Sequence, residues 1–397
     1  MGSADLSDPG LTFGGMKFLH TADWQLGMTR SFLDGEAQAR FSAARREAVA
    51  ALGKVARETG AEFVVVAGDV FESNQLAPRA VSQSLEAMRA IDVPVYLLPG
   101  NHDPLDAASV YRSALFAREC PANVTVLDRP GAFDVRPGVQ IVAAPWHSKR
   151  PTTDLTAEVL AGLAADGTAR ILVAHGAVDI FDPDPNNPSQ IRMNGLADSL
   201  DRSAVHYVAL GDKHSRTAVG DSGRVWYSGA PEVTNYDHVE ADSGHVLVVD
   251  MDLGDPGHPV TVESRKVGSW RFLTLHREVN NSRDIADLDV NLDQLTDKGR
   301  TVVQLALVGT LTVTDRALLE DCRDKYSRLF ACLDTWDRHT NLVVMPADDE
   351  FDDLGIGGFA AGALDELVSL ARSEEAQAGA ARGALGLLMR LRDGSVA

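Results

Sequence analysis

Short apolar runs alternate with stretches of helical periodicity over the first 235 residues of the chain. The runs that predict strands are residues 17–20, 63–67, 95–98, 139–143, 171–174 and 207–210. Residues 39–59 place apolar side chains three and four positions apart and end before Gly60, which predicts a helix. Pro78 opens a second predicted helix, and residues 153–164 form a third. This alternation predicts a layered α/β domain whose ligands gather at the carboxyl ends of the strands.

The pattern changes after two further predicted strands, residues 225–228 and 246–251. A turn-rich stretch, DLGDPGHP at residues 252–259, precedes a second set of elements. That set comprises strands at 270–276, 301–308 and 342–345, a helix at 315–331, and tail helices at 360–371 and 380–391. We therefore expect a flexible leader at residues 1–15, a main domain at 16–253, a small β/α domain at 260–346 and a helical tail at 347–397.

Composition narrows the class of protein. The chain has 397 residues, of which 45% are hydrophobic and 24% charged, as in ordinary soluble proteins of about two domains. Its net charge of −20 argues against a broad basic surface for nucleic acid, although bound cations or a local basic patch can still hold a phosphate. The three cysteines have no metal-ligand spacing, which favours reduced thiols and a cytoplasmic location. No apolar run approaches the roughly 20 residues of a membrane span, so we expect no membrane contact.

Polar side chains follow five of the predicted strands, each at the strand's end. They are Asp23, Asp69, Asn101 with His102, His175, and Asp212 with His214. Few functions need carboxylates, imidazoles and an amide at the ends of separate strands. Binding two divalent cations and hydrolysing a phosphate ester is one function that does.

These motifs, in this order, resemble those of the calcineurin-like metallophosphoesterases, and within them the SbcD-type DNA exonuclease subunits. The segments that carry the resemblance are residues 20–27 (HTADWQLG), 66–71 (VAGDVF), 98–103 (LPGNHD) and 207–214 (YVALGDKH). The resemblance implies the metallophosphoesterase fold, a layered β-sandwich flanked by helices. It also implies that the small β/α domain is a capping domain and that the helical tail binds a partner.

The resemblance also assigns roles to the polar residues at the strand ends. It implies that Asp69 bridges two divalent metals. On the first metal it places Asp23, His214 and the residue at position 25. On the second it places Asn101, His175 and the residue at position 212.

The family's acid–base machinery falls on the residues after Asn101. The resemblance implies that His102 donates a proton or hydrogen bond to the leaving oxygen. It implies that Asp103 orients the His102 ring.

Two positions depart from the family's usual pattern. Gln25 and Asp212 stand where the family usually has histidine. Two nitrogen ligands thereby become oxygen ligands, which shifts the preference toward Mn²⁺ or Mg²⁺ and away from zinc. An eroded metal site is one reading of these changes. A working variant is the reading we prefer, because both replacements still offer an oxygen ligand.

The resemblance implies a two-metal-dependent phosphodiester hydrolase. It would act as a DNA exonuclease or endonuclease at DNA ends in repair. Its partners would be an SbcC-like ABC-type ATPase and a second copy of the chain, in the cytoplasm at the nucleoid. Two alternatives stay open: a metallophosphoesterase acting on a small nucleotide or phosphomonoester, which the charge favours, and a non-catalytic scaffold that binds DNA ends or the ATPase.

Overall fold

The computed structural model describes residues 15–344 except 182, 185 and 256, residues 358–373, and scattered positions between 377 and 388. The chain divides into two compact units. The first contains Met1–Ser31 and Gln38–Trp270, and the second contains Phe32–Ala37 and Arg271–Ala397. The predicted leader, residues 1–15, lies outside the described residues except for Gly15.

Two six-stranded sheets form the centre of the first unit. In order across the first sheet, the strands are β12 (Val260–Lys266), β11 (His245–Met251), β1 (Met16–Thr21), β2 (Phe63–Val66), β3 (Val95–Leu97) and β4 (Val124–Val126). Across the second they are β5 (Gly131–Arg136), β6 (Val139–Ala144), β7 (Ala169–His175), β8 (Tyr207–Gly211), β10 (Val225–Tyr227) and β9 (Thr217–Ala218). Strands β1 to β4 are parallel, as are β6, β7, β8 and β10, so each sheet has one edge where carboxyl ends gather.

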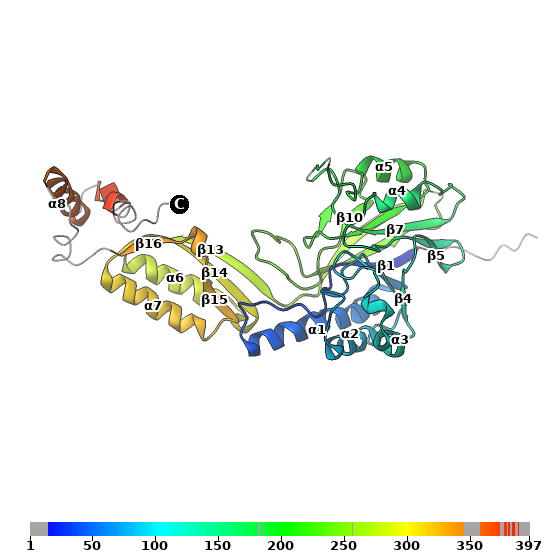
Figure 1. Ribbon diagram of the computed structural model, residues 1–397, viewed down its shortest axis with the longest axis horizontal. Helices are drawn as coiled ribbons and strands as arrows, with labels where there is room; N and C mark the ends of the chain where they lie inside the picture. The colour runs from blue at the N-terminus through cyan, green and yellow to red at the C-terminus, as the bar shows by residue number, and fades with distance from the viewer. Residues whose placement is uncertain are drawn as a thin grey trace, which may run out of the picture. The chain divides into compact units, whose positions relative to one another are not determined.

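Successive side chains of a strand point to opposite faces of its sheet, and one face of each sheet packs against the other sheet. Phe63 and Val65 of β2 belong to the core between the sheets, together with Ile171 of β7. The alternate residues of the first sheet face α1 (Gly35–Thr59), α2 (Pro78–Arg89), η1 (Val110–Arg112) and α3 (Ala114–Glu119). Those of the second face α4 (Leu155–Leu160) and α5 (Met193–Asp201), which completes a helix–sheet–sheet–helix sandwich (Figure 1). Burial on both faces explains why these strands are continuous apolar runs.

The sandwich confirms the predicted fold class and the six strands that the apolar runs indicated, with shifts of one or two residues at their ends. The third predicted helix is shorter than expected. This helix, α4, begins at Leu155 because the side chain of Asp154 accepts hydrogen bonds from the backbone nitrogens of Thr156 and Ala157, and it ends at Leu160. Strands β4, β5, β9 and β12 and helices α3 and α5 were not predicted.

The boundary between the units differs from the prediction. Strand β12 pairs with β11 along its whole length, from Met251 opposite Val260 to His245 opposite Lys266. The turn-rich stretch at 252–259 is therefore a hairpin loop, closed by a hydrogen bond from Asp252 N to Pro259 O, and not a linker. Residues 260–270 belong to the first unit, and the second unit resumes at Arg271.

One four-stranded sheet and two helices form the second unit. Strands β13 (Arg271–Glu278), β14 (Thr301–Leu311), β15 (Cys332–Thr335) and β16 (Asn341–Val344) pair in parallel. Helices α6 (Ser282–Gln294) and α7 (Val313–Ser327) lie side by side on one face of this sheet (Figure 1). The turns η2 (Lys298–Arg300) and η3 (Asp337–His339) join strands to their neighbours. The sequence predicts this β/α module, but α6 and β15 were not predicted.

The tail contains α8 (Phe359–Arg372), as predicted. Most of the second predicted tail helix, residues 380–391, lies outside the described residues. Within the described part of the chain, no helix is both long enough and apolar enough to span a membrane.

Candidate metal site

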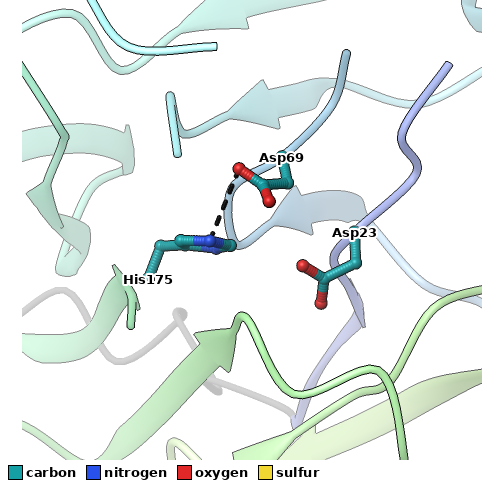
Figure 2. Close-up of side chains that lie close together, drawn as sticks. All are labelled: Asp23, Asp69 and His175. Atoms are coloured by element: carbon teal, nitrogen blue, oxygen red, sulfur yellow. Dashed lines mark ion pairs between the residues drawn. The ribbon is translucent and has the colours of Figure 1, made fainter. Parts of the chain in front are cut away.

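The polar residues at the strand ends come together, but from two sheets and not from one. Asp23, Asp69 and Asn101 follow strands of the first sheet, and His175 ends a strand of the second. Asp69 Oδ1 lies 3.4 Å from His175 Nε2 across the two sheets. Figure 2 shows this pair with Asp23 beside it. The ligand atoms of these three buried side chains lie within 4.8 Å of one another.

The backbone at this site is strained. Seven described residues other than glycine have a positive φ, and four of them are predicted ligands: Asp23 (54°), Gln25 (42°), Asp69 (52°) and Asp212 (102°). Such conformations cost about 1–3 kcal/mol each and persist where the surroundings impose them. Here the loop that carries Asp23 and Gln25 and the loop that carries Asp69 stabilise each other, since Asp23 N donates to Gly68 O and Gln25 N donates to Asp69 O. Concentration of strain at one cluster of polar residues is typical of a functional site.

His175 is at the centre of one half of the site. Its Nδ1 lies 2.8 Å from the carbonyl of Ala67, so that nitrogen carries a proton and Nε2 faces the cluster. Nε2 lies 2.7 Å from Asn101 Oδ1 and 3.9 Å from Asp212 Oδ1. Burial favours a low pKa for this imidazole, but the carboxylate of Asp69 outweighs it and the pKa of His175 is raised. A cation bound at Nε2 would face the same oxygen atoms of Asn101, Asp69 and Asp212.

Asp23 is at the centre of the other half. Complete burial raises its pKa to about 7, against the attraction of His214 and His175. Its two oxygens accept hydrogen bonds from Asp212 N at 3.1 and 3.2 Å, and His214 Nε2 lies 3.9 Å from Oδ1. Gln25 Nε2 lies 3.3 Å from the same His214 nitrogen.

The donors fit divalent cations. Gln25 is 2% exposed, and its Oε1 has no hydrogen-bond partner. An unpaired buried oxygen is costly, and a bound cation would remove that cost. The carboxylates of Asp69 and Asp212 also raise the pKa of Asp23, as expected for neighbouring negative charges that a bound cation would offset. Carboxylate and amide oxygens with two imidazoles are a donor set that divalent metals accept.

His102 and Asp103 do not pair as expected. Asp103 is fully buried and accepts hydrogen bonds from Gly100 N, Phe71 N and Tyr111 Oη at 2.8, 2.9 and 2.6 Å. The Nδ1 of His102 instead lies 3.0 Å from the carbonyl of Glu72. Asp103 therefore shapes the loop that carries Asn101 and His102, and a backbone carbonyl orients the ring.

His102 nevertheless lies at the candidate metal site. Its Nε2 is 3.8 Å from Asp69 Oδ2, and its backbone nitrogen donates to Asp69 Oδ1 at 2.9 Å. The side chain is 37% exposed, so Nε2 is accessible to a substrate while Nδ1 is fixed. This arrangement suits a group that hands a proton to a leaving oxygen.

Several residues of this site were missed in the sequence. Arg45 of α1 is 2% exposed and donates to the carbonyls of Asp23 and Trp24 in the first ligand loop. Thr234 and Glu240 contact the Nδ1 side of His214. The one available signal was Arg45 itself, a charged residue beside Ala44 on the apolar face of a predicted helix.

A helix–sheet–sheet–helix sandwich with such a cluster at the carboxyl ends of its strands defines a class of metal-dependent hydrolases. Residues 16–250 match the family model for calcineurin-like phosphoesterase. That match covers more than half of the chain, so the chain belongs to this family. The predicted family, its fold class and a metal-dependent phosphoesterase are thereby confirmed.

Two curated relatives match over part of their length. The SbcD subunit of the SbcCD nuclease of Rhodobacter capsulatus is 27% identical over 289 residues, which cover 62% of this chain and 68% of that protein. The DNA double-strand break repair protein Mre11 of Archaeoglobus fulgidus is 28% identical over 215 residues, covering 50% of this chain and 46% of its own. This chain thus spans about half the length of the second relative. A solved structure from Thermus thermophilus, that of the protein TT1561, covers 64% of this chain and 99% of its own, at 12% identity and a TM-score of 0.40.

Proposed function

We propose that this chain is a two-metal phosphodiester hydrolase that cuts DNA at its ends. The observation that carries this proposal is the buried cluster of Asp23, Asp69 and His175, with His102 beside it. The matched relatives are named as part of a nuclease and as a DNA double-strand break repair protein, which supports DNA as the substrate.

The contacts among the candidate ligands support two groups, with Asp69 as the ligand that both would share. His214 lies close to both Asp23 and Gln25, and these three would hold one cation. His175 contacts Asn101 and Asp212, and these three would hold the other. Bound cations would stabilise both the attacking oxygen and the charge that develops on the phosphate. His102, oriented by the Glu72 carbonyl, would pass a proton from Nε2 to the leaving oxygen.

We infer that Mn²⁺, or else Mg²⁺, is the working metal. Gln25 and Asp212 add oxygen donors where the family usually has histidines, and oxygen donors suit these ions better than zinc. The unpaired Gln25 Oε1 supports a working variant over an eroded site, because it is buried beside His214 and has an unused acceptor. Elemental analysis tests this inference, and stoichiometric, tightly bound zinc would contradict it.

We also propose the setting of the reaction. The chain would work in the cytoplasm, at the nucleoid, with an SbcC-like ABC-type ATPase and as a homodimer, as its likeness to part of an SbcCD nuclease suggests. In the tail, Leu364, Val368 and Leu385 form a small buried cluster that packs the tail residues together, and we propose this helical tail as the partner-binding segment. Co-purification of the ATPase with this chain tests the assignment, when the full chain is compared with a chain that lacks residues 347–397. Co-elution that survives the truncation would contradict it.

A nuclease assay separates the candidate functions. The substrates are linear DNA, hairpin DNA and bis(p-nitrophenyl) phosphate, each with Mn²⁺, Mg²⁺ or EDTA. We expect cation-dependent cutting of DNA that Asp69→Asn abolishes and that Asp221→Asn, in an exposed loop, leaves intact. Hydrolysis of the small diester alone would favour a small-molecule phosphoesterase, which the net charge of −20 supports. Failure to cut any of the substrates would leave the scaffold function.

A further inference from the structure

His214 is held differently from the other candidate histidine ligand. The Nδ1 of His175 lies against a backbone carbonyl, that of Ala67. The Nδ1 of His214 lies 2.6 Å from the hydroxyl oxygen of Thr234 and 3.4 Å from the carboxylate of Glu240. Thr234 is 1% exposed and Glu240 is 4% exposed, so these contacts are shielded from water.

The direction of each hydrogen bond follows from the number of protons available. Thr234 donates its hydroxyl proton to Glu240 Oε2 at 2.5 Å, and its backbone nitrogen donates to Oε1 at 2.9 Å. An ionised carboxylate only accepts, and a hydroxyl has one proton to give. The Thr234 oxygen can therefore only accept from His214, which places a proton on Nδ1. The lone pair of Nε2 is left pointing toward Gln25 and Asp23.

We propose that Glu240 and Thr234 form a relay that fixes the tautomer and ring orientation of His214 as a ligand of the first cation. The two residues are positioning residues, and the inference rests on the proposed function. An imidazole whose second nitrogen donates toward a carboxylate is a stronger ligand, and removal of such a partner typically weakens metal binding roughly 10- to 100-fold. The relay would strengthen His214 where its neighbour Gln25 offers only a neutral amide oxygen.

The segment that carries the relay is fixed on both sides. Arg45 donates to the carbonyl of Val233 at 3.1 Å, and Arg30 donates to the carbonyl of Thr234. The Glu240 nitrogen donates to the carbonyl of Tyr236 at 2.9 Å, which closes the turn between the two relay residues. Bonds within the chain itself therefore hold the relay in place, as a rigid ligand site requires.

Three substitutions distinguish the effect of the Thr234 hydroxyl from the effect of side-chain packing. Thr234→Val keeps the shape and removes the hydroxyl, whereas Thr234→Ser keeps the hydroxyl. Thr156→Val is the matched control, because Thr156 is also buried and bonds a carboxylate, that of Asp154, in α4. The measurement is Mn²⁺ binding to the full chain by isothermal titration calorimetry, with circular dichroism to check folding. We expect Thr234→Val to weaken one of two Mn²⁺ ions about 10- to 100-fold and the serine and control variants to change binding less than about threefold.

Glu240→Gln tests the direction of the relay. A glutamine amide can donate to the Thr234 oxygen, so the hydroxyl proton would turn toward His214 and move the imidazole proton to Nε2. We expect this variant to lose the same Mn²⁺ ion as Thr234→Val. It remains informative if the valine variant does not fold.

The outcomes distinguish this inference from the function on which it rests. Wild-type protein that binds no Mn²⁺ would overturn the proposed function together with the relay. Two normal Mn²⁺ ions in folded Thr234→Val or Glu240→Gln protein would overturn the relay alone. Equal losses in the serine and valine variants would also overturn it, because packing and not the hydroxyl would then be responsible.

Discussion

The substitution Arg45→Met tests whether the buried guanidinium of Arg45 holds the loop that carries Asp23 and Gln25 in its strained conformation. The guanidinium of Arg45 donates to Trp24 O from Nη2 at 2.6 Å and from Nε at 3.2 Å. Further bonds reach the carbonyl of Asp23 at 3.5 Å and those of Glu232 and Val233 at 3.3 and 3.1 Å. One side chain therefore ties the loop that carries Asp23 to the segment that precedes Thr234.

The expected cost follows from these contacts. Burial lowers the pKa of Arg45 to about 10, with the carboxylate of Glu232 opposing the shift, so the side chain is charged at neutral pH. A hydrogen bond to a charged group contributes roughly 1.5–3 kcal/mol, and its loss leaves the carbonyl partner buried and unpaired. Removal of one partner from a buried charged network typically costs about 3–5 kcal/mol. We expect Arg45→Met to lower the free energy of unfolding of the first unit by about 3–5 kcal/mol.

Urea unfolding in EDTA measures this loss, and calorimetric titration with Mn²⁺ measures the effect on the site. Arg170→Met is the control, since Arg170 is 5% exposed and bonds Gln140, Ala164 and Asp166. Both variants should lose stability, but only Arg45→Met should also weaken Mn²⁺ binding. A stable Arg45→Met protein, or equal Mn²⁺ affinities in the two folded variants, would refute the reasoning.

Three further substitutions probe the site and a buried histidine of the neighbouring strand β1. Gly68→Ala should abolish tight Mn²⁺ binding in titrations, because Gly68 has a φ of +94° and a Cβ there would lie 2.1 Å from His175 Nδ1; normal binding would contradict this. His102→Gln should slow DNA hydrolysis about 10²- to 10⁴-fold while both Mn²⁺ ions still bind, and loss of metal would instead make His102 a ligand. Burial lowers the pKa of His20 to about 3, although the Leu210 carbonyl opposes this, so the unfolded chain takes up the proton first. Stability should fall by up to about 1.4 kcal/mol per pH unit from about pH 6.5 toward 3, and His20→Gln should flatten that slope in urea titrations at several pH values.

The sequence predicted that the candidate ligands follow buried strands, but not to which sheet each strand belongs. Asp69 and His175 each end a buried apolar strand, and such runs are easy to recognise because both faces of the strand are covered. Nothing in either run shows to which of two sheets it belongs. The assignment of each side chain to its sheet therefore comes only from the structure, whereas the expectation that the side chains meet is supported by the distances between them.

The predicted domain boundary differs from the observed one for a local reason. Residues 252–259 contain the glycines and prolines of a linker, but the same residues suit a hairpin loop. The choice between them depends on whether residues 260–266 pair with β11, whose partners range from Met251 opposite Val260 to His245 opposite Lys266. Composition alone does not decide between a loop and a linker.

The residues that position the candidate ligands could not be predicted from the sequence, for a different reason. Arg45 bonds carbonyl groups 21 and 188 positions away, and Thr234 lies 20 positions from His214. Contacts of this kind leave no periodic pattern, because they depend on how the loops of the two sheets meet. A buried arginine on an apolar helix face is nevertheless exceptional, since charged side chains are seldom fully buried without partners. Arg45 shows that such a residue in a predicted helix is best interpreted as a clamp on backbone carbonyls near the functional site.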